Sequence, residues 1–247
     1  MANAFLSEKE SLRFGQRIIR LRQSFVNAEE VASEMERLKA DLLILRVPAP
    51  EIVNLHKLHQ LAYHILVADT LVYYSTQLNG TQPLALQNPL AMRPATLADT
   101  ADITQLIKRI FLTYTNHYTS NPNLPRLDVI EGYVEWALGH VTQPGHILFI
   151  SEFNQEAVAF AACSYDENGR DCEGVLFGVD SSVQGRGIYT DLIRYTKYHF
   201  ANLKYQRMLV STQVQNFAVQ KSWVKEHFKI DNAFYTIHVS RKPYTGK

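Results

Sequence analysis

The residues whose types and spacing most clearly suggest a binding site form the segment Gln184-Gly185-Arg186-Gly187-Ile188-Tyr189. The segment follows an apolar run that ends at Val179 and precedes an amphipathic stretch, which predicts a turn between a strand and a helix. Glycines let a backbone approach a ligand without a side chain in the way, and the first amides of a helix have no intrahelical partner. Together with the helix dipole, these amides make the segment a candidate anion-binding turn.

Two common phosphate-binding patterns do not match this turn. A P-loop requires Gly-Lys-Ser or Gly-Lys-Thr, which does not follow here. The dinucleotide fingerprint requires a third glycine, which is absent, and this turn lies late in the chain. From the glycines alone, a connection that binds nothing remains an alternative.

The elements that must position the turn follow it and precede it in a regular order. Apolar runs predict strands over residues 90–94, 147–151, 157–164, 174–179, 207–212 and 233–239, and helical periodicity predicts helices over 99–113, 128–140, 187–202 and 216–227. Asp99 is the expected N-cap of the first of these helices. Asn168-Gly169 is the expected turn of a hairpin.

In this setting the turn resembles the Gln/Arg-x-x-Gly-x-Gly/Ala signature of the GCN5-related N-acetyltransferases, with Gln184, Gly187 and Tyr189 at the signature positions. The segment Met92-Arg93-Pro94-Ala95-Thr96 also resembles the start of that family, and the resemblance extends over residues 90–240. It implies an α/β fold with a central mixed, mostly antiparallel twisted sheet flanked by helices. Tyr189 departs from the signature, because the family has a small residue at this position.

The resemblance also implies a cofactor and a reaction. Acetyl-CoA, or another acyl-CoA, would be the co-substrate, with no metal, and a neutral amine would attack the thioester directly in a ternary complex. The residues it assigns to CoA binding are Phe177, Val179, Gln184, Gly185, Arg186, Gly187, Ile188, Tyr189 and Asn216. The backbone of Phe177 and Val179 would bond to the pantetheine arm as a strand would.

The candidate catalytic residues are Asn216, Tyr235, His117 and His238. Many members of the family carry a tyrosine acid where this chain has Trp223, whose indole is a donor only. Tyr235 is therefore the alternative acid, and the two histidines are candidate bases because their pKa lies near neutral pH. Asn216 can bond the pantetheine arm and a water, or simply cap its helix.

A second, narrower resemblance concerns the acceptor. Ser211-Thr212-Gln213-Val214-Gln215-Asn216 resembles the Thr-Gln-x-x-Asn segment of bacterial dTDP-4-amino-sugar N-acetyltransferases of the dTDP-fucosamine type. His117-Tyr118 and Tyr235-Thr236-Ile237-His238 resemble their acceptor loop and last strand. This implies an amino-sugar linked to a nucleotide as the amine substrate. The alternatives are a peptide, a polyamine or another small amine, or a CoA-binding protein without activity.

The N-terminal part predicts a separate β-α-β-α-β unit. Strands are expected over residues 17–21, 41–47 and 67–75, a helix after the cap Asn27 and a second helix over 51–64. Phe14-Gly15 and this order resemble the truncated first half of the same enzymes. We therefore expect an N-terminal unit over residues 1–80, a linker over 81–89 and an acyl-CoA-binding catalytic domain over 90–247.

The composition of the chain bears on its binding partners and its location in the cell. The chain has 247 residues with a formal net charge of +1, so no bulk attraction to nucleic acid or to an anionic membrane is implied. No signal peptide or membrane-spanning run is evident, and Cys163 and Cys172 are expected as reduced thiols, with a disulfide across the hairpin as the alternative. These features predict a cytoplasmic protein without metal, with a small-molecule amine substrate, no membrane insertion and a homodimer as an open option.

Overall fold

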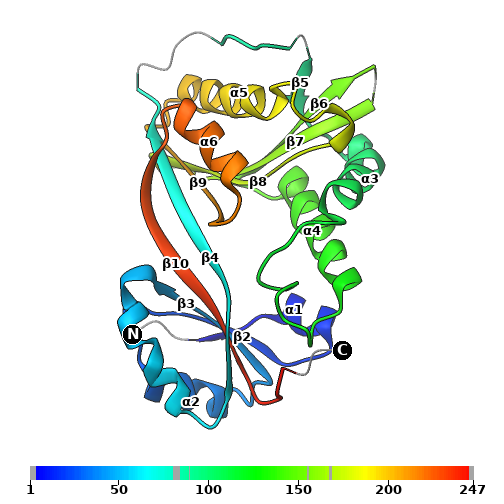
Figure 1. Cartoon of the computed structure of the whole chain (residues 1–247). Helices are drawn as coiled ribbons and strands as arrows, with labels where there is room; N and C mark the ends of the chain where they lie inside the picture. The colour runs from blue at the N-terminus through cyan, green and yellow to red at the C-terminus, as the bar shows by residue number, and fades with distance from the viewer. Residues whose placement is uncertain (1–3, 80–83, 89, 155, 167–168, 245–247) are drawn as a thin grey trace. The chain divides into compact units, whose positions relative to one another are not determined.

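The computed structural model describes residues 4–79, 84–88, 90–154, 156–166 and 169–244 (Figure 1). Contacts divide the chain into two compact units. Unit 1 comprises Met1–Val72, Thr115–Val129 and Asn232–Lys247, and unit 2 comprises Tyr73–Tyr114 and Ile130–Asp231. These limits differ from the expected division at residues 80 and 90, because the last strand and the loop after residue 114 pack within unit 1. The division into an N-terminal unit, a linker and a catalytic domain stays a prediction.

Unit 1 contains a sheet with the strand order β1-β2-β3-β10. Its elements are β1 (Phe5–Leu6), α1 (Glu8–Phe14), β2 (Ile18–Arg22), α2 (Ala28–Arg37), β3 (Leu42–Pro48), a 3-10 helix (Ala49–Gln60), and parts of β4 (His64–Gln77) and β10 (Lys229–Ser240). Strands β2 and β3 are parallel, and β10 is antiparallel to β3. One face of the sheet packs against Val31 and Met35 of α2, both fully buried. Asn27 caps α2 by accepting the amide of Glu30 at 3.1 Å, as predicted.

The predicted second helix of this unit is wrong in type. Residues 49–60 form a 3-10 helix, and only Leu58 is buried in it. Ile52 in this stretch is 56% exposed. The stretch therefore lacks the continuous apolar stripe that stabilises an α-helix.

Unit 2 contains a sheet with the order β4-β9-β8-β7-β6-β5. Its elements besides β4 are β5 (Ala91–Pro94), a 3-10 helix (Leu97–Asp99), α3 (Thr100–Phe111), α4 (Arg126–Thr142, from Ile130 on), β6 (His146–Phe153), β7 (Glu156–Tyr165), β8 (Asp171–Val179), a 3-10 helix (Ser181–Val183), α5 (Ile188–Asn202), β9 (Arg207–Gln213) and α6 (Phe217–Lys225). Strands β5 to β8 are antiparallel neighbours, whereas β8 and β9 are parallel. The predicted mixed sheet flanked by helices is confirmed.

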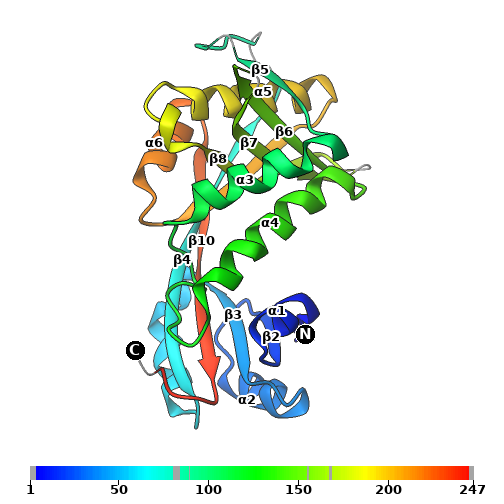
Figure 2. The same cartoon turned by 90° about the vertical axis from the view of Figure 1, so that its right-hand side faces the viewer.

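The alternation of side chains along β6 explains how helices cover both faces of this sheet. Leu148 and Ile150 pack with α3 and α4 in one core, together with Phe160 of β7. Phe149, between them, points to the other face, where its ring lies 5.3 Å from that of Tyr195 of α5. Figure 2 shows α3 and α4 on one face and α5 on the other. The strand that ends at Val179 is thereby held between two helical layers.

Three further expectations concern thiols, metals and membranes. Cys163 and Cys172 are free and buried. Burial raises the pKa of both thiols, so they are protonated at neutral pH. The hairpin turn at Asn168 lies outside the described residues. Within the part of the chain that the structure describes, no helix is long and apolar enough to cross a membrane, and no group of at least 3 His, Cys, Asp or Glu side chains could hold a metal.

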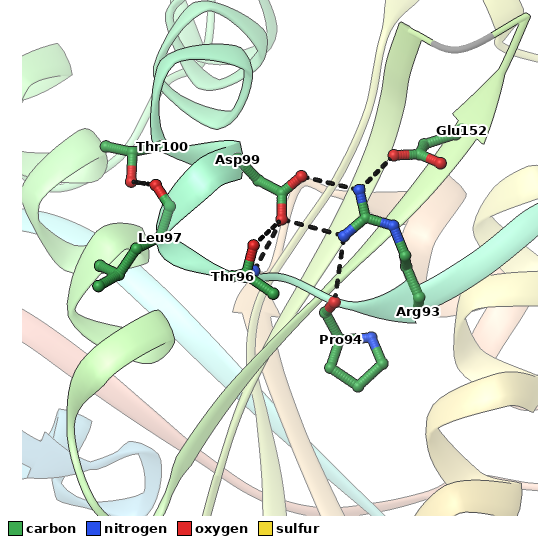
Figure 3. A network of polar contacts seen from close by, with 7 residues as sticks. All are labelled: Arg93, Pro94, Thr96, Leu97, Asp99, Thr100 and Glu152. Carbon is green, nitrogen blue, oxygen red and sulfur yellow. Dashed lines mark hydrogen bonds and ion pairs between the residues drawn. The ribbon is translucent and has the colours of Figure 1, made fainter.

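A polar network fixes the entry into α3 (Figure 3). The carboxylate of Asp99 accepts from Thr96 N at 2.7 Å and from Arg93 Nη2 at 2.7 Å, and Arg93 also contacts Glu152 at 2.6 Å. Asp99 is therefore not the side-chain cap of α3 that the sequence predicts. It forms a capping box with Thr96 around the 3-10 turn that precedes α3. The hydrogen bonds from Arg93 hold the pKa of Asp99 well below its usual range.

Replacing Asp99 by Ala should lower the free energy of unfolding by about 1–2 kcal/mol, because the capping box is lost. Urea denaturation at pH 7 measures this change. The matched control is Asp102→Ala, which removes an exposed carboxylate from the first turn of α3. Equal unfolding midpoints for the two variants would contradict the assignment.

Candidate functional site

The Gln184–Tyr189 turn has a backbone that only glycine adopts readily at two positions. Gly185 has φ +78° and Gly187 has φ +84°, both in the left-handed region. Gly187 is the N-cap of α5, and the amide of Asp191 donates to its carbonyl at 3.1 Å. The two glycines therefore place the chain for a helix start directly after the 3-10 helix Ser181–Val183.

The amides of this turn are available to a ligand. Among the described residues, the N–H groups of Gly185, Gly187 and Ile188 donate no hydrogen bond. The amide of Gln184 is different, because it donates to Ser181 O at 3.4 Å. Unpaired amides at the positive end of a helix dipole form an anion-binding site. The backbone of unit 2 thus has unpaired amides at the predicted turn, and their use for an anion stays a prediction.

Asp180 anchors the start of the turn. Its carboxylate accepts from Arg109 Nε of α3 at 2.7 Å and from Ser182 N at 3.0 Å. Burial raises the pKa of this carboxyl, but these hydrogen bonds and the charge of Arg109 outweigh it, so the pKa is lowered. Sequence reasoning missed this pair, because the two residues are 71 positions apart.

The backbone of Phe177 and Val179 points away from β7. Asp180 N donates to Val158 O at 2.8 Å, which makes these two residues a hydrogen-bonded pair of the antiparallel ladder. Because such pairs alternate with non-hydrogen-bonded ones, Val179 and Phe177 face the other neighbour, β9.

The register between β8 and β9 ends before it reaches these two residues. The last paired residues are Gly174 and Val210, although β8 continues to Val179. The edge of β8 from residue 175 to 179 is therefore open toward an extended ligand. Gln184 Nε2 reaches the Val179 carbonyl at 3.4 Å, at the end of this edge.

Tyr189, the departure from the small signature residue, directs its ring into unit 2. The ring lies 6.1 Å from that of Phe177. Burial raises the pKa of its hydroxyl, although the neighbouring Trp223 indole opposes this shift. The Tyr189 ring therefore packs beside Phe177 within unit 2.

Trp223 anchors α6 in the core of unit 2. It is 3% exposed and packs against the rings of Tyr74 and Phe228, at 5.4 and 6.4 Å. Its Nε1 is buried without a hydrogen bond of good geometry to the described residues. An indole in this position holds the helix and offers no titratable proton.

Asn216 begins α6 without capping it by its side chain. Its Nδ2 instead donates to Thr212 Oγ1 of β9 at 3.1 Å, so plain capping does not explain the residue. Nearby, the hydroxyl of Tyr114 donates to Gln213 Oε1. Sequence reasoning did not single out Tyr114, which follows the end of α3 and has no motif of its own.

The other candidate catalytic residues lie in unit 1. His117 Nδ1 is 3.0 Å from His238 Nε2, and His238 Nδ1 is 2.9 Å from Asn121 Nδ2. Asn121 Oδ1 accepts from Asn123 N at 2.9 Å, which sets the orientation of its amide. His238 Nδ1 is then an acceptor, and its Nε2–H donates to His117 Nδ1. Tyr235 packs at the edge of the unit 1 core.

A charged group adjoins these rings. Glu10 accepts from Arg20 through both oxygens, at 2.6 and 2.7 Å, and from the hydroxyl of Tyr118. The Tyr118 ring lies 3.8 Å from that of His117. Burial, together with the charge of Arg20, lowers the pKa of His238 to about 3, against an opposing effect of Glu10. Burial, His238, Arg20 and Arg46 hold the pKa of His117 well below its usual range.

Unit 1 should therefore lose stability in acid. Both imidazoles are neutral when folded and bind protons near pH 6.5 when unfolded, so their contribution is full above that pH and declines below it. The slope is at most about 1.4 kcal/mol per pH unit for each ring. Urea denaturation between pH 7.5 and 5 measures it. His64→Gln, which changes an exposed histidine of β4, should keep this dependence, whereas His238→Gln should reduce it. A profile unchanged by His238→Gln would refute the assignment.

Comparisons with known proteins agree with this geometry. Residues 106–228 match the sequence profile of the Acetyltransferase (GNAT) family. This stretch contains the open edge of β8, the turn, α5 and Asn216. A search of curated protein sequences returns no match.

Solved structures share the fold at low sequence identity. A functionally unknown conserved protein from Staphylococcus epidermidis has a TM-score of 0.66 at 11% identity, over 97% of this chain and 92% of its own. A GCN5-related N-acetyltransferase from Sphaerobacter thermophilus has a TM-score of 0.66 at 10% identity, over 93% and 75%. The glucosamine N-acetyltransferase region of a fungal multi-domain GH3 beta-N-acetylglucosaminidase has a TM-score of 0.58 at 14% identity, over 85% and 27%.

The residues that match the family profile include the turn that opens α5. The family uses acetyl-CoA as co-substrate, and the unpaired amides of this turn suit the diphosphate of CoA. Residues 106–228 match the acetyltransferase (GNAT) family, which indicates a CoA-dependent N-acetyltransferase domain in this chain.

Proposed function

We propose that this enzyme transfers an acetyl group from acetyl-CoA to the primary amine of a nucleotide-linked amino-sugar, with the CoA diphosphate on the Gln184–Tyr189 turn. The observation that carries the CoA assignment is the pair of left-handed glycines, Gly185 and Gly187, whose amides have no acceptor among the described residues. Arg186, exposed between them, adds a positive charge for the phosphates.

The residues of β8 supply the rest of the donor site. The open backbone edge at Phe177 and Val179 would hold the pantetheine arm through strand-like hydrogen bonds. The Val179 N–H at the end of this edge would polarise the thioester carbonyl, and one preorganised donor of this kind contributes about 3–4 kcal/mol in other acyl-transfer sites. Direct attack by a neutral amine then needs positioning and no enzyme nucleophile.

The catalytic side chains stay predictions. Asn216 is the residue that unit 2 itself offers, because its amide is anchored to Thr212 and not spent on capping. For His117 and His238 the role of base rests on the ordinary pKa of histidine, and Tyr235 is the candidate acid because Trp223 stands where the family has a tyrosine. The dependence of kcat on pH tests them, since a variant of the base would lose the acidic limb of the wild-type profile.

The amino-sugar acceptor is supported by two observations. The Ser211–Asn216 segment resembles that of enzymes that acetylate dTDP-4-amino-sugars. One structure with the same fold is described as a glucosamine N-acetyltransferase region, so this fold accommodates a sugar amine in that protein. A peptide, a polyamine or another small amine is the alternative within the same reaction.

Thiol release from acetyl-CoA should be fastest with a dTDP-4-amino-sugar. We expect kcat/KM for that acceptor to exceed the values for glucosamine, spermidine and a lysine peptide by at least about tenfold, because a site that recognises the nucleotide adds binding energy. A thiol-reactive chromophore follows the reaction. A higher kcat/KM for the polyamine or the peptide would overturn the acceptor and retain the acetyltransferase.

A charge placed in the turn should repel the diphosphate. A Cβ at Gly185 would meet nothing within 4 Å, and Asn and Asp are the residues that best tolerate its left-handed backbone after glycine. Gly185→Asp should therefore bind CoA about tenfold more weakly than the isosteric Gly185→Asn, since the carboxylate faces like charge. Calorimetry measures both affinities. Equal affinities would place the diphosphate elsewhere.

A further inference from the structure

A short segment ahead of β5 runs along the first half of α5. Its residues 84–88 are here called the arm. Arg194 Nη1 donates to Ala85 O at 3.1 Å, and Arg194 is itself paired with Glu226 at 2.9 Å. Gln87 and Asn88 contact the first turn of α5 through Asp191. The arm is thus attached beside the turn that begins the helix.

Asp191 is the centre of this attachment. It is fully buried, and its Oδ1 accepts from Gln87 N at 2.8 Å. Its Oδ2 accepts from Asn88 N at 2.9 Å and from Asn88 Nδ2 at 2.8 Å. A buried carboxylate is costly unless its oxygens are hydrogen-bonded, and the start of a helix favours its charge. Among the described residues, no Lys or Arg forms an ion pair with Asp191. The hydrogen bonds that its carboxylate accepts from described residues all come from the arm.

Asn88 carries this attachment on to the turn. Its Nδ2 also donates to the carbonyl of Arg186 at 2.9 Å. In a trans peptide, the C=O of one residue and the N–H of the next point in opposite directions. Because the Arg186 carbonyl is held toward the arm, the Gly187 N–H is directed away from it. This N–H is one of the amides that have no acceptor among the described residues.

We propose that Asp191 and Asn88 are positioning residues that fix the Gly187 amide of the turn for the diphosphate of CoA. The inference rests on the proposed CoA site and adds the arm to it. Asp191 holds Asn88, Asn88 holds the peptide unit between Arg186 and Gly187, and that unit presents its donor. A donor that is oriented before the ligand arrives loses little freedom on binding.

The arm also gives a second reason for glycine at position 187. A Cβ there would lie 2.4 Å from Gln87 Oε1. A larger residue at 187 would therefore push the tip of the Gln87 side chain aside as well as crowd the ligand. Variants of Gly187 cannot separate these two effects, whereas variants of Asn88 change the arm without touching the backbone of the turn.

The test is Asn88→Ala, which removes the contacts of Nδ2 with both Arg186 and Asp191. Its affinity for CoA, measured by calorimetry, should fall about three- to tenfold, the effect of one or two hydrogen bonds. In spectra of glycine-labelled protein, the Gly187 amide proton should shift strongly when CoA is added to the wild type and less in the variant. A merely structural role would leave this shift unchanged.

The matched control is Asn202→Ala, the same change at the exposed C-terminal end of α5. It should bind CoA as the wild type does. Asp191→Asn is the second variant, because its amide nitrogen cannot accept from the arm, and it should weaken CoA binding in the same direction. The proposal is overturned if Asn88→Ala and Asp191→Asn match Asn202→Ala in affinity and in the Gly187 shift. A wild type that fails to bind CoA would instead overturn the proposed function.

Discussion

The start of α5 is the constraint on which the site depends, because a helix leaves its first amides without intrahelical partners. In most proteins a side chain caps them, but here the N-cap is Gly187, which has no side chain to offer. Side chains from elsewhere in unit 2 hold the backbone of the turn instead. Arg109 holds Asp180 ahead of the turn, and Asp191 with Asn88 holds the peptide behind it. The amides of the turn remain unpaired, while these contacts hold the backbone on both sides of them.

The same logic applies to the strand that leads into the turn. β8 gives its hydrogen bonds to β7 at alternate residues, and the pairing with β9 ends at Gly174 and Val210. The remaining edge has backbone groups that no strand pairs, so an extended ligand can bind there as an added strand would. Tyr189 and Trp223, the two departures from the family pattern, do not disturb this edge because their side chains pack within unit 2.

Local features of the fold followed from the sequence, and distant pairings did not. Period-two and helical patterns predicted the strands and helices around Gly185 and Gly187, and Asn27 was a correct cap, since each depends on neighbours within a turn. The 3-10 helix at residues 49–60 was mistaken for an α-helix because only Leu58 of its apolar residues is buried. The contact of Asn88 with Asp191 spans 103 positions, and no spacing rule connects an arm to a helix at that distance.

The histidines show how a correct choice of residues can leave a role open. His117 and His238 were selected for their ordinary pKa, but the structure buries them next to each other. With Asn121 donating to His238, and His238 donating to His117, the chain of hydrogen bonds leaves the proton of His117 on Nε2. Neither ring then has a free lone pair, so the pair is arranged to donate. A base role for His117 would require a different tautomer, which the contact of Asn121 Oδ1 with Asn123 N opposes. In this arrangement the two rings are neutral and ordered as donors, so the base role predicted for them would need the hydrogen bonds of Asn121 to be rearranged first.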